Sequence, residues 1–423
     1  MIQVRSIAIA LKLARGLAVG IVPAAIVLTP AVVQAAEQGS RKITTRAVAE
    51  PLKKAQDAMG KKQWDTALAE IKKAQAVTKK TPFEAYQIDE FLGYVLIQQK
   101  KYGEAAPVFE RVLNSGMLPA EQVDERTKTV AQLYFQVKDY GKAAQWSKRW
   151  VDKHPGDQEM GVLLAQSYYL LKDYKSAAAT MSNVVSRAER AGRTPQENWL
   201  QIVMSSKFNL DDRDGIGEAL KKLVRYYPKD EYWANLLDIY RRKADGDRVT
   251  LGYYRLMNDV GALKDKGDYV EMAQLAIDAG VPGEAQYVVE KGVELGTLKS
   301  ADKTEQGRYD RLLTSAKKLA TEDQASLAQL SKEAEKATKG QPSVALGQAY
   351  LSYGKYQDAI KALTSGIAKG GLLDADEAHI SLGIAYMKSN QKDLARKAFQ
   401  AVKDASKWEQ LAELWTLRTY ASA

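Results

Sequence analysis

The chain has 423 residues, of which 45% are hydrophobic, and it carries a formal net charge of +10 at pH 7. It has no cysteine and only two histidines, which excludes disulfides, thiolate chemistry, cysteine-ligated zinc and most catalytic triads. Basic residues are interspersed with acidic ones along the chain, a pattern typical of solvated helix faces rather than of a nucleic-acid-binding patch. The surplus of positive charge would favour an acidic partner or an anionic surface.

Residues 1–35 have the pattern of a secretory signal peptide. Three basic residues precede the apolar segment GLAVGIVPAAIVL, and the small residues Val33 and Ala35 favour cleavage before Ala36. Retention of this segment as an uncleaved anchor is the alternative. No later segment is apolar enough to span a membrane. The sequence therefore predicts an exported protein, periplasmic in a Gram-negative bacterium, whose residues 36–45 form a flexible mature N-terminus.

A helical motif recurs further along the chain at steps of 34 to 38 residues. Its clearest copies are FLGYVLIQQKKYGEAAPVF, ALGQAYLSYGKYQDAIKAL and SLGIAYMKSNQKDLARKAF, which place Gly93, Gly347 and Gly383 twelve residues before an alanine. A glycine inside a helix costs about 0.5–1 kcal/mol relative to alanine, so its recurrence at one phase indicates a packing role. We expect each copy to be two antiparallel helices, A and B, whose backbones come closest at these small residues.

These copies predict an all-α fold, a right-handed α-solenoid of helix pairs. An N-terminal array would span 46–295, with a divergent part at 199–260, and a C-terminal array would span 296–402. In 403–423, two tryptophans and two leucines share one helix face: Trp408, Leu411, Leu414 and Trp415. We expect this segment to cap the last repeat, because open-ended arrays need a cap for solubility. Docking of this helix on a partner is the alternative.

The recurring small and aromatic residues resemble the tetratricopeptide repeat (TPR), whose pattern is W-x2-L-G-x2-Y…A-x3-F…P. The segments AQLYFQVKDYGKAAQWSKRWV, PQENWLQIVMSSKFNL and LAIDAGVPGEAQYVVEKGVELG also resemble exported TPR proteins that accompany TonB–ExbB–ExbD energy-transduction systems in proteobacteria. The second resemblance implies a periplasmic scaffold that serves a TonB-type complex for outer-membrane uptake. Proteins of the TonB, ExbB or ExbD type would then be its partners.

Partner binding in a helical solenoid is expected on its concave face. Counting the small residue of helix A as position 8, we expect positions 5, 9, 12 and 13 to point there. The candidate partner-binding residues are Tyr94, Gln98, Gln132, Phe135, Gln136, Gln166, Tyr169, Gln348, Ile384, Met387 and Lys388. Glutamine amides beside aromatic rings suit an extended peptide or a helix, since the amide both donates and accepts hydrogen bonds. Solvated glutamines on a helix face are the alternative.

The sequence has no P-loop motif and no H-E-x-x-H motif. It therefore predicts a non-enzymatic scaffold that binds another protein, with no cofactor, no metal and no nucleic acid. Two alternatives of other classes stay open. One is an adaptor in envelope biogenesis or secretion, and the other is an accessory scaffold that positions a cell-wall enzyme.

Overall fold

The computed structural model describes residues 42–420, and each regular element in this range is a helix. The predicted signal peptide lies outside the described residues. The chain divides into two compact units, Met1–Asp212 and Arg213–Ala423, called unit 1 and unit 2 below. This division falls within the segment 199–260 that diverges in sequence, whereas the array boundary expected near 295 lies inside unit 2. Within the described range, no helix is both long and apolar enough to cross a membrane.

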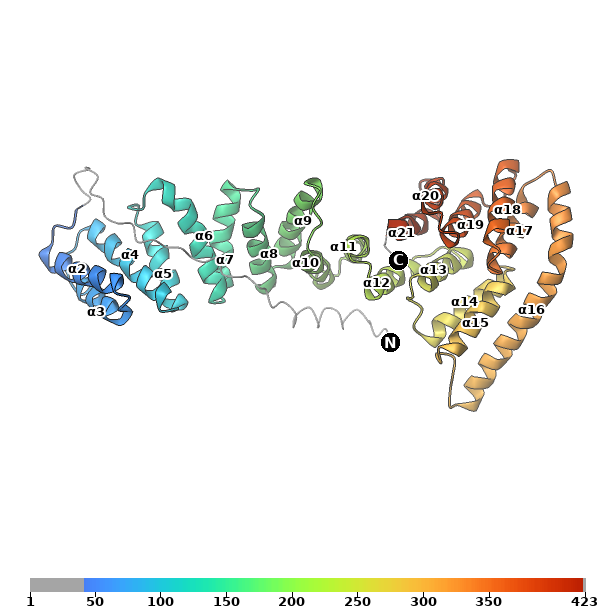
Figure 1. Cartoon of the computed structure of the whole chain (residues 1–423), viewed down its shortest axis with the longest axis horizontal. Helices are drawn as coiled ribbons and strands as arrows, with labels where there is room; N and C mark the ends of the chain where they lie inside the picture. The colour runs from blue at the N-terminus through green and yellow to red at the C-terminus, as the bar shows by residue number, and fades with distance from the viewer. Residues whose placement is uncertain (1–41, 421–423) are drawn as a thin grey trace. The chain divides into compact units, whose positions relative to one another are not determined.

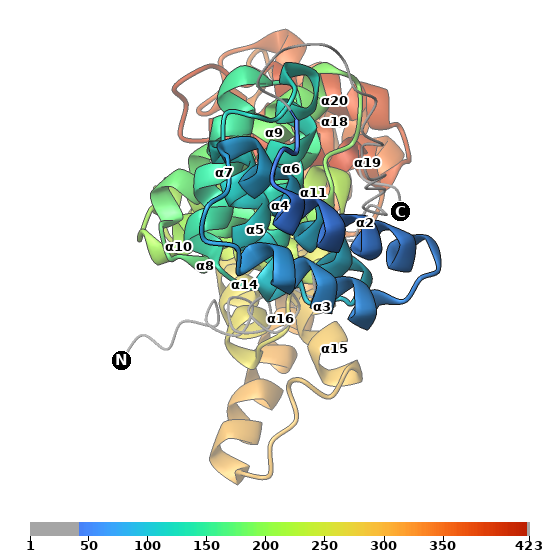
Figure 2. The same ribbon diagram turned by 90° about the vertical axis from the view of Figure 1, so that its left-hand side faces the viewer.

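Unit 1 is a series of helices in which each helix packs against the next along the chain. They are α2 (Arg46–Gly60), α3 (Trp64–Gln75), α4 (Pro82–Gln98), α5 (Tyr102–Asn114), α6 (Ala120–Gln136), α7 (Tyr140–Lys153), α8 (Gln158–Leu170), α9 (Tyr174–Arg190) and α10 (Glu197–Asn209). From α2 to α9, the even-numbered helices are the A helices and the odd-numbered ones the B helices of successive pairs (Figure 1). Figure 2 shows the first pair, α2 and α3, nearest the viewer. The predicted all-α arrangement of helix pairs is confirmed.

The recurring glycines make room for a large side chain of helix B. A Cβ atom on Gly93 would lie 2.7 Å from Phe109 Cε1, and one on Gly347 would lie 2.6 Å from Leu363 Cγ. The same kind of contact occurs at Gly383. Atoms overlap at such distances, so a larger residue would push the two helices apart. The packing role is confirmed, but the side chain over each glycine comes sixteen residues later, not from the alanine twelve residues later.

Four A helices of unit 1 are followed, two residues after their last residue, by a lysine with left-handed backbone geometry. Lys62, Lys100, Lys138 and Lys172 have φ angles between 56° and 65°, and each lies in the short turn to helix B. The N–H groups of the lysine and of the next residue bond back to carbonyl groups of the helix, as in a Schellman motif. Glycine is the usual residue there because it has no Cβ to clash with the backbone. Tight turns of this type hold the two helices of a pair antiparallel.

The start of the described chain is anchored to α4 by a buried carboxylate. Glu84 accepts hydrogen bonds from the backbone N–H groups of Thr44 at 2.9 Å and of Thr45 and Thr81 at 2.8 Å. Burial alone would raise the pKa of Glu84 above its ordinary value of 4.5. These donors, with the Thr45 hydroxyl, lower the pKa by more than burial raises it, so that it is about 2. Residues 44 and 45 are therefore fixed, and the expectation that all of 36–45 is flexible is wrong at its C-terminal end.

Unit 2 contains more helices and one that is much longer. They are α11 (Arg213–Tyr226), α12 (Asp230–Arg241), α13 (Asp247–Asp259), α14 (Lys266–Asp278), α15 (Pro282–Glu294), α16 (Lys303–Lys336), α17 (Gln341–Ser352), α18 (Tyr356–Lys369), α19 (Ala375–Lys388), α20 (Lys392–Gln400) and α21 (Glu409–Tyr420). The 34-residue α16 occupies most of the polar segment in which the sequence gave no clear repeat phase, and it packs against α15 and α17. The pairs α17–α18 and α19–α20 follow the predicted A–B order.

The last helix, α21, packs on the last repeat as a capping helix. The ring of Trp415 stacks on Phe399 of α20, with centroids 5.8 Å apart and an interplanar angle of 17°. Trp408 and Leu411, on the same stripe, are buried as well. Because the apolar stripe is already covered inside unit 2, the alternative of partner docking through this stripe is wrong.

Helix α21 also packs against the beginning of unit 2. Leu411 lies directly against Gly252 of α13, which has no side chain to keep it away. Glu413 pairs with Lys221 of α11, with Oε1 and Nζ 2.9 Å apart. The two ends of unit 2 are thus in contact, so that the helices of this unit form a closed series.

Candidate functional site

The predicted partner-binding residues of unit 1 lie on its A helices, α4, α6 and α8. We call the surface formed by Tyr94, Gln98, Gln132, Phe135, Gln136 and Tyr169 the A-helix face of unit 1. Gln98 and Gln136 are exposed, and the other four are partly buried. The face thus combines free amide groups with aromatic rings, the two features expected of a peptide-binding surface.

The aromatic rings on this face are held in place by other aromatic rings. Phe135 meets Tyr140 at the start of α7, with ring centroids 5.5 Å apart in an edge-to-face arrangement. Tyr169 and Tyr174 make the same arrangement one repeat later, also at 5.5 Å. Edge-to-face pairs of this kind contribute about 0.5–1.5 kcal/mol beyond the burial of their area. The rings are therefore fixed at the rim of the A–B turn before any partner arrives.

Sequence reasoning missed the B-helix partners of these rings. Tyr140 and Tyr174 each open a helix B five residues after the aromatic residue of helix A. Trp64 plays a related part, because its ring lies 6.0 Å from that of Tyr94. A signal was available: an aromatic residue follows the turn in most copies, in KQW, KKY, KDY and GKY.

The glutamines of the A-helix face fall into two groups. Gln132 Nε2 donates a hydrogen bond to Glu159 Oε1 of the next A helix at 2.7 Å. Gln98 and Gln136, at position 13, make no hydrogen bond with any other residue in the described part of the chain. Position 9 therefore links neighbouring repeats, whereas position 13 presents a free amide.

The prediction that Gln166 belongs to the binding face is wrong. Its side chain is 3% exposed, so it cannot contact a partner on this face. The next A helix, α10, packs beside α8 here, and the hydroxyl groups of Tyr169 and Ser205 share a hydrogen bond of 2.7 Å. Sequence spacing placed Gln166 on the correct helix but gave no information on how tightly α10 would cover it.

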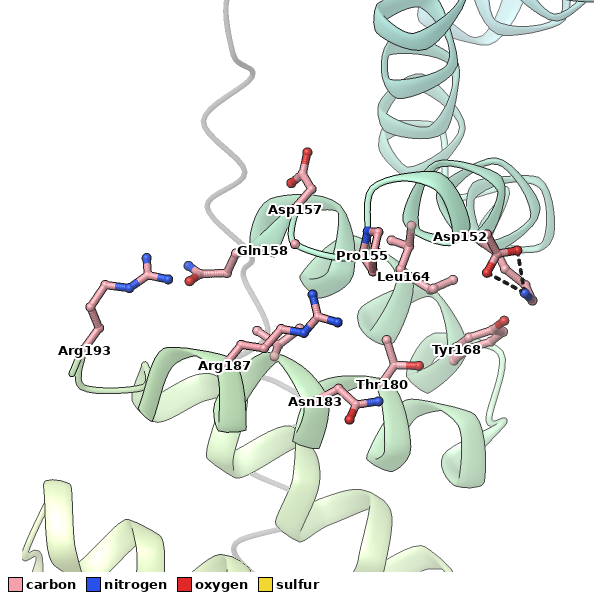
Figure 3. A pocket seen from close by; sticks show the side chains of 14 residues that line it. Asp152, Pro155, Asp157, Gln158, Leu164, Tyr168, Thr180, Asn183, Arg187 and Arg193 are labelled. Carbon is pink, nitrogen blue, oxygen red and sulfur yellow. Dashed lines mark hydrogen bonds and ion pairs between the residues drawn. The ribbon is translucent and has the colours of Figure 1, made fainter. Parts of the chain in front are cut away.

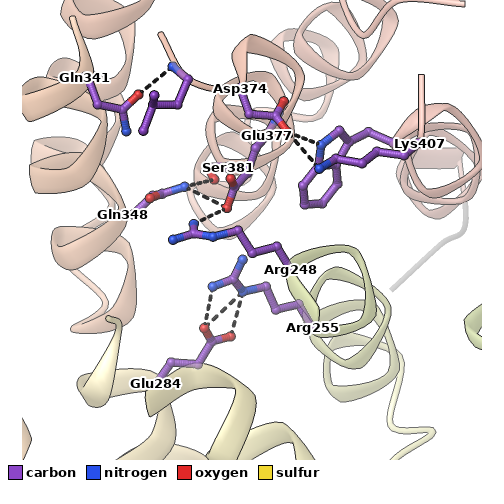
Figure 4. Close-up of polar contacts among 11 residues, drawn as sticks. Arg248, Arg255, Glu284, Gln341, Gln348, Asp374, Glu377, Ser381 and Lys407 are labelled. Atoms are coloured by element: carbon purple, nitrogen blue, oxygen red, sulfur yellow. Dashed lines mark hydrogen bonds and ion pairs between the residues drawn. The ribbon is translucent and has the colours of Figure 1, made fainter. Parts of the chain in front are cut away.

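The predicted residues of unit 2 lie on α17 and α19, and their surroundings differ from those in unit 1. Gln348 Nε2 donates to Ser381 Oγ at 3.2 Å and to Glu377 Oε1 at 3.4 Å. The same Glu377 pairs with Arg248 of α13 at 2.7 Å, as Figure 4 shows. Ile384 is 5% exposed, and Met387 is partly buried. Gln348 thus links α17 to α19 as Gln132 links α6 to α8, whereas Ile384 is buried and its assignment to a free binding face is wrong.

Helix α13 reaches this surface through ion pairs of its side chains. Arg255 forms a bidentate pair with Glu284 of α15, with contacts of 2.8 to 3.0 Å (Figure 4). Asp259 pairs with Lys388 of α19 at 2.7 Å and with Arg418 of α21 at 2.8 Å. Lys388, a predicted partner-binding residue, therefore binds the chain's own α13.

The electrostatics of Asp259 show that this contact stabilises the fold. Its side chain is 10% exposed. Burial raises its pKa, but the neighbouring cations Lys388 and Arg418 outweigh burial, so the pKa of Asp259 lies below its ordinary value. A buried carboxylate that stays charged between two cations contributes to stability at neutral pH. Among residues 42–420, no cluster of three or more histidine and acidic residues forms a possible metal site.

Comparisons with known proteins agree with the repeat pattern. The family described as Tetratricopeptide repeat matches residues 52–120 and 344–407. The family described as Anaphase-promoting complex, cyclosome, subunit 3 matches residues 98–184. No curated protein matches the chain.

Several solved structures are similar to parts of the chain at low identity. The MamA protein of Desulfovibrio magneticus RS-1 is 17% identical, covers 44% of this chain and 97% of that one, and has a TM-score of 0.29. A tetratricopeptide repeat protein from Parabacteroides merdae is 15% identical, covers 64% and 99%, and has a TM-score of 0.30. YrrB, described as a TPR protein with an unusual peptide-binding site, is 15% identical, covers 44% and 95%, and has a TM-score of 0.31.

Repeats of this family stack into arrays that serve as scaffolds for protein–protein interaction, and the fold supports that role here. The two matched segments coincide with helices that pack as A–B pairs in unit 1 and unit 2. The chain contains tetratricopeptide repeats in these two segments.

Proposed function

We propose that this protein is a non-enzymatic scaffold, exported to the periplasm, that supports a TonB-type energy-transduction complex. Its A-helix face in unit 1 binds an extended peptide or a helix of a protein partner. The observation that carries the binding proposal is the pair of free amides, Gln98 and Gln136, one repeat apart on an uncovered face. The export and TonB parts rest on the signal-peptide pattern and on the sequence resemblance described above.

The chemistry of the face suits a peptide backbone. Each free amide can donate to a carbonyl group and accept from an N–H group, and an extended peptide backbone presents both of these groups. The rings of Phe135 and Tyr169 are partly buried and pre-oriented, so little side-chain entropy is lost when a partner packs on them. The equivalent face of unit 2 differs, because ion pairs join α13 to α19 there.

The direct test is site-specific photo-crosslinking in the native bacterium. The crosslinking amino acid benzoylphenylalanine replaces Gln136, and the adducts are identified by mass spectrometry. We expect a protein of the TonB, ExbB or ExbD type to be crosslinked. Gln145, an exposed glutamine on helix B of the same repeat, is the matched control position and should give no such adduct.

Two outcomes would contradict the proposal. Equal adducts at Gln136 and Gln145 would show that the A-helix face is not the binding surface. An adduct at Gln136 with an outer-membrane assembly or cell-wall protein would retain the face but replace the TonB part with one of the alternatives. Fractionation of spheroplasts tests export separately, and the mature protein should begin at Ala36.

The contribution of the amides can then be measured on the purified pair. The double variant Gln98→Ala and Gln136→Ala should weaken binding of the crosslinked partner by about tenfold, from the loss of two hydrogen bonds. Both side chains are exposed, so the melting temperature should not change. Unchanged affinity would show that the amides are merely solvated.

A further inference from the structure

A pocket of about 250 Å³ lies on the other side of unit 1, between the B helices α7 and α9. Its floor is apolar, because Leu164 and Val184 line it and are 4% and 6% exposed. Its polar lining includes Lys148, Tyr168 and Arg187. Figure 3 shows Arg187 extending from α9 toward the wall that contains Pro155. The pocket is separate from the A-helix face, and nothing in the proposed function uses it.

The preceding pair of B helices, α5 and α7, has an internal carboxylate at the equivalent place. There Glu110 accepts a hydrogen bond from the hydroxyl of Tyr134 and pairs with Lys142. The chain thus joins α5, α6 and α7 through one partly buried polar cluster. Tyr134 is only 4% exposed as a result.

The pocket between α7 and α9 has no acidic residue at the position equivalent to Glu110. The repeat alignment that matches Ala131 with Ala165 places Tyr168 at the position of Tyr134. The position of Glu110 is taken by Lys148, and that of Lys142 by Ser176. The Tyr168 hydroxyl consequently has no hydrogen-bond partner among the described residues.

A second acid is lost at the rim. In the preceding pair, Asp124 pairs with Lys153 at 3.5 Å and with His154 at 2.9 Å. The same repeat step places Gln158 at the position of Asp124 and Arg187 at the position of Lys153. The cation is retained, but its carboxylate is replaced by a neutral amide.

The acids that do line the pocket are engaged elsewhere. Asp152 pairs with Lys148 at 2.7 Å on the same helix. Asp157 accepts from the N–H group of Met160 and from Trp150 Nε1, and it pairs with Lys128 at 3.2 Å. Arg187 has no carboxylate partner in the described part of the chain, and neither has Arg193 at the edge of the pocket.

We propose that this pocket binds a glutamate or aspartate side chain of an acidic peptide segment in a protein partner. The carboxylate takes the place that Asp124 fills in the preceding pair, against the guanidinium of Arg187. A neighbouring apolar residue of the peptide packs on Leu164 and Val184. Guanidinium–carboxylate hydrogen bonds are short and roughly twice as strong as neutral ones. Arg187, which has no carboxylate partner in the described part of the chain, should therefore favour a carboxylate over an amide.

The test uses a fluorescein-labelled peptide of the sequence Gly-Glu-Leu-Glu-Leu-Gly and its glutamine analogue, Gly-Gln-Leu-Gln-Leu-Gly. Fluorescence anisotropy with the mature chain measures both. We expect the glutamate peptide to bind about tenfold more tightly than the glutamine peptide. Equal affinity for the two peptides would overturn the proposal.

Matched variants separate the pocket from general attraction by a basic protein. Arg187→Gln should lose about tenfold in affinity for the glutamate peptide. Arg190→Gln removes the same charge from the same helix at an exposed position that does not line the pocket, and it should bind as the unchanged chain does. Equal losses in the two variants would show non-specific attraction and sink the proposal.

A third variant restores the missing acid within the chain. Gln158→Asp recreates the Asp124 of the preceding pair, so Arg187 gains a partner within the chain, and the peptide should no longer bind. Circular dichroism should show a melting temperature that does not fall. Full peptide binding by this folded variant would contradict the assigned position of the carboxylate. Loss of binding in Gln136→Ala would instead place the peptide on the A-helix face, and the pocket proposal would fail while the proposed function stood.

Discussion

Gln136 in unit 1 and Lys388 in unit 2 occupy the same position of their repeats, but their surroundings are opposite. Gln136 is exposed and free, whereas Lys388 is bound to Asp259 of α13. The A helices that carry them obey the same packing rule, in which a glycine or alanine accommodates a side chain of helix B. What differs is that the two ends of unit 2 are in contact. Ion pairs join α13 to α19 and to α21, and α21 packs on α20.

The comparison shows that a repeat motif determines how two helices pair, and not whether the face they present is available. In unit 2, ion pairs between distant segments, such as Arg248 with Glu377, engage residues of the A helices. The equivalent residues of the A helices in unit 1 make no such long-range pairs in the described part of the chain. Access to an interaction face is therefore a property of the whole unit. Each of the following predictions tests one side of this contrast.

The largest effect should come from breaking the closure of unit 2. Asp259→Ala removes one carboxylate and leaves Lys388 and Arg418 without it, which we expect to cost about 3 kcal/mol of unfolding free energy in urea. Asp214→Ala is the control, because this side chain is 87% exposed in its pair with Lys243 and should cost at most about 1 kcal/mol. Equal effects of the two variants would mean that α13 does not stabilise unit 2.

The packing rule shared by both units is tested at Gly93. Gly93→Val would place atoms inside the ring of Phe109, and overpacking of this kind costs about 1–3 kcal/mol. In the neighbouring helix, a Cβ on Gly103 would meet nothing within 4 Å, so Gly103→Ala should be neutral or stabilising. Chemical denaturation of both variants measures the difference, and a tolerated valine at Gly93 would refute the rule.

The pH dependence of unit 1 should follow Glu84. Its folded pKa, about 2, is below the ordinary value of 4.5, so it contributes stability that is fully present above pH 4.5. This contribution is lost as the pH falls toward 2, because the protonated carboxyl no longer accepts all of its bonds. Glu84→Gln should cost about 1–2 kcal/mol at pH 7 and nothing further at low pH. Parallel acid-unfolding curves for the two proteins would rule this out.

The smallest effect concerns the turns. Unit 1 has lysines at its left-handed turn positions, whereas unit 2 has Gly354 and Asn390 at the equivalent ones. Lys138→Gly should raise stability by about 0.5–1 kcal/mol, since glycine has no Cβ to strain that backbone. Gly354→Lys should lower stability by a similar amount. Differential scanning calorimetry measures both, and a destabilised Lys138→Gly would show that the lysine side chain itself contributes to the fold.

Several features were accessible from the sequence because they depend on neighbours along the chain. The phase of Gly93, Gly347 and Gly383 predicted helix pairs, and the spacing of Trp408 and Trp415 predicted a buried stripe. These patterns are local, since the partner of each glycine lies sixteen residues away on the adjoining helix.

The tertiary structure alone decided which predicted site residues are free. Gln132 and Gln166 share one repeat position with Gln348 and Ile384. The amides of Gln132 and Gln348 are partly exposed and bond to the next A helix, whereas Gln166 and Ile384 are buried. The covering of unit 2 depends on pairs between residues 129 and 159 positions apart, such as Asp259 with Lys388 and with Arg418. Repeat periodicity fixes only the contacts between adjacent helices, so it carries no information on how a series of helices curves back and covers its own surface.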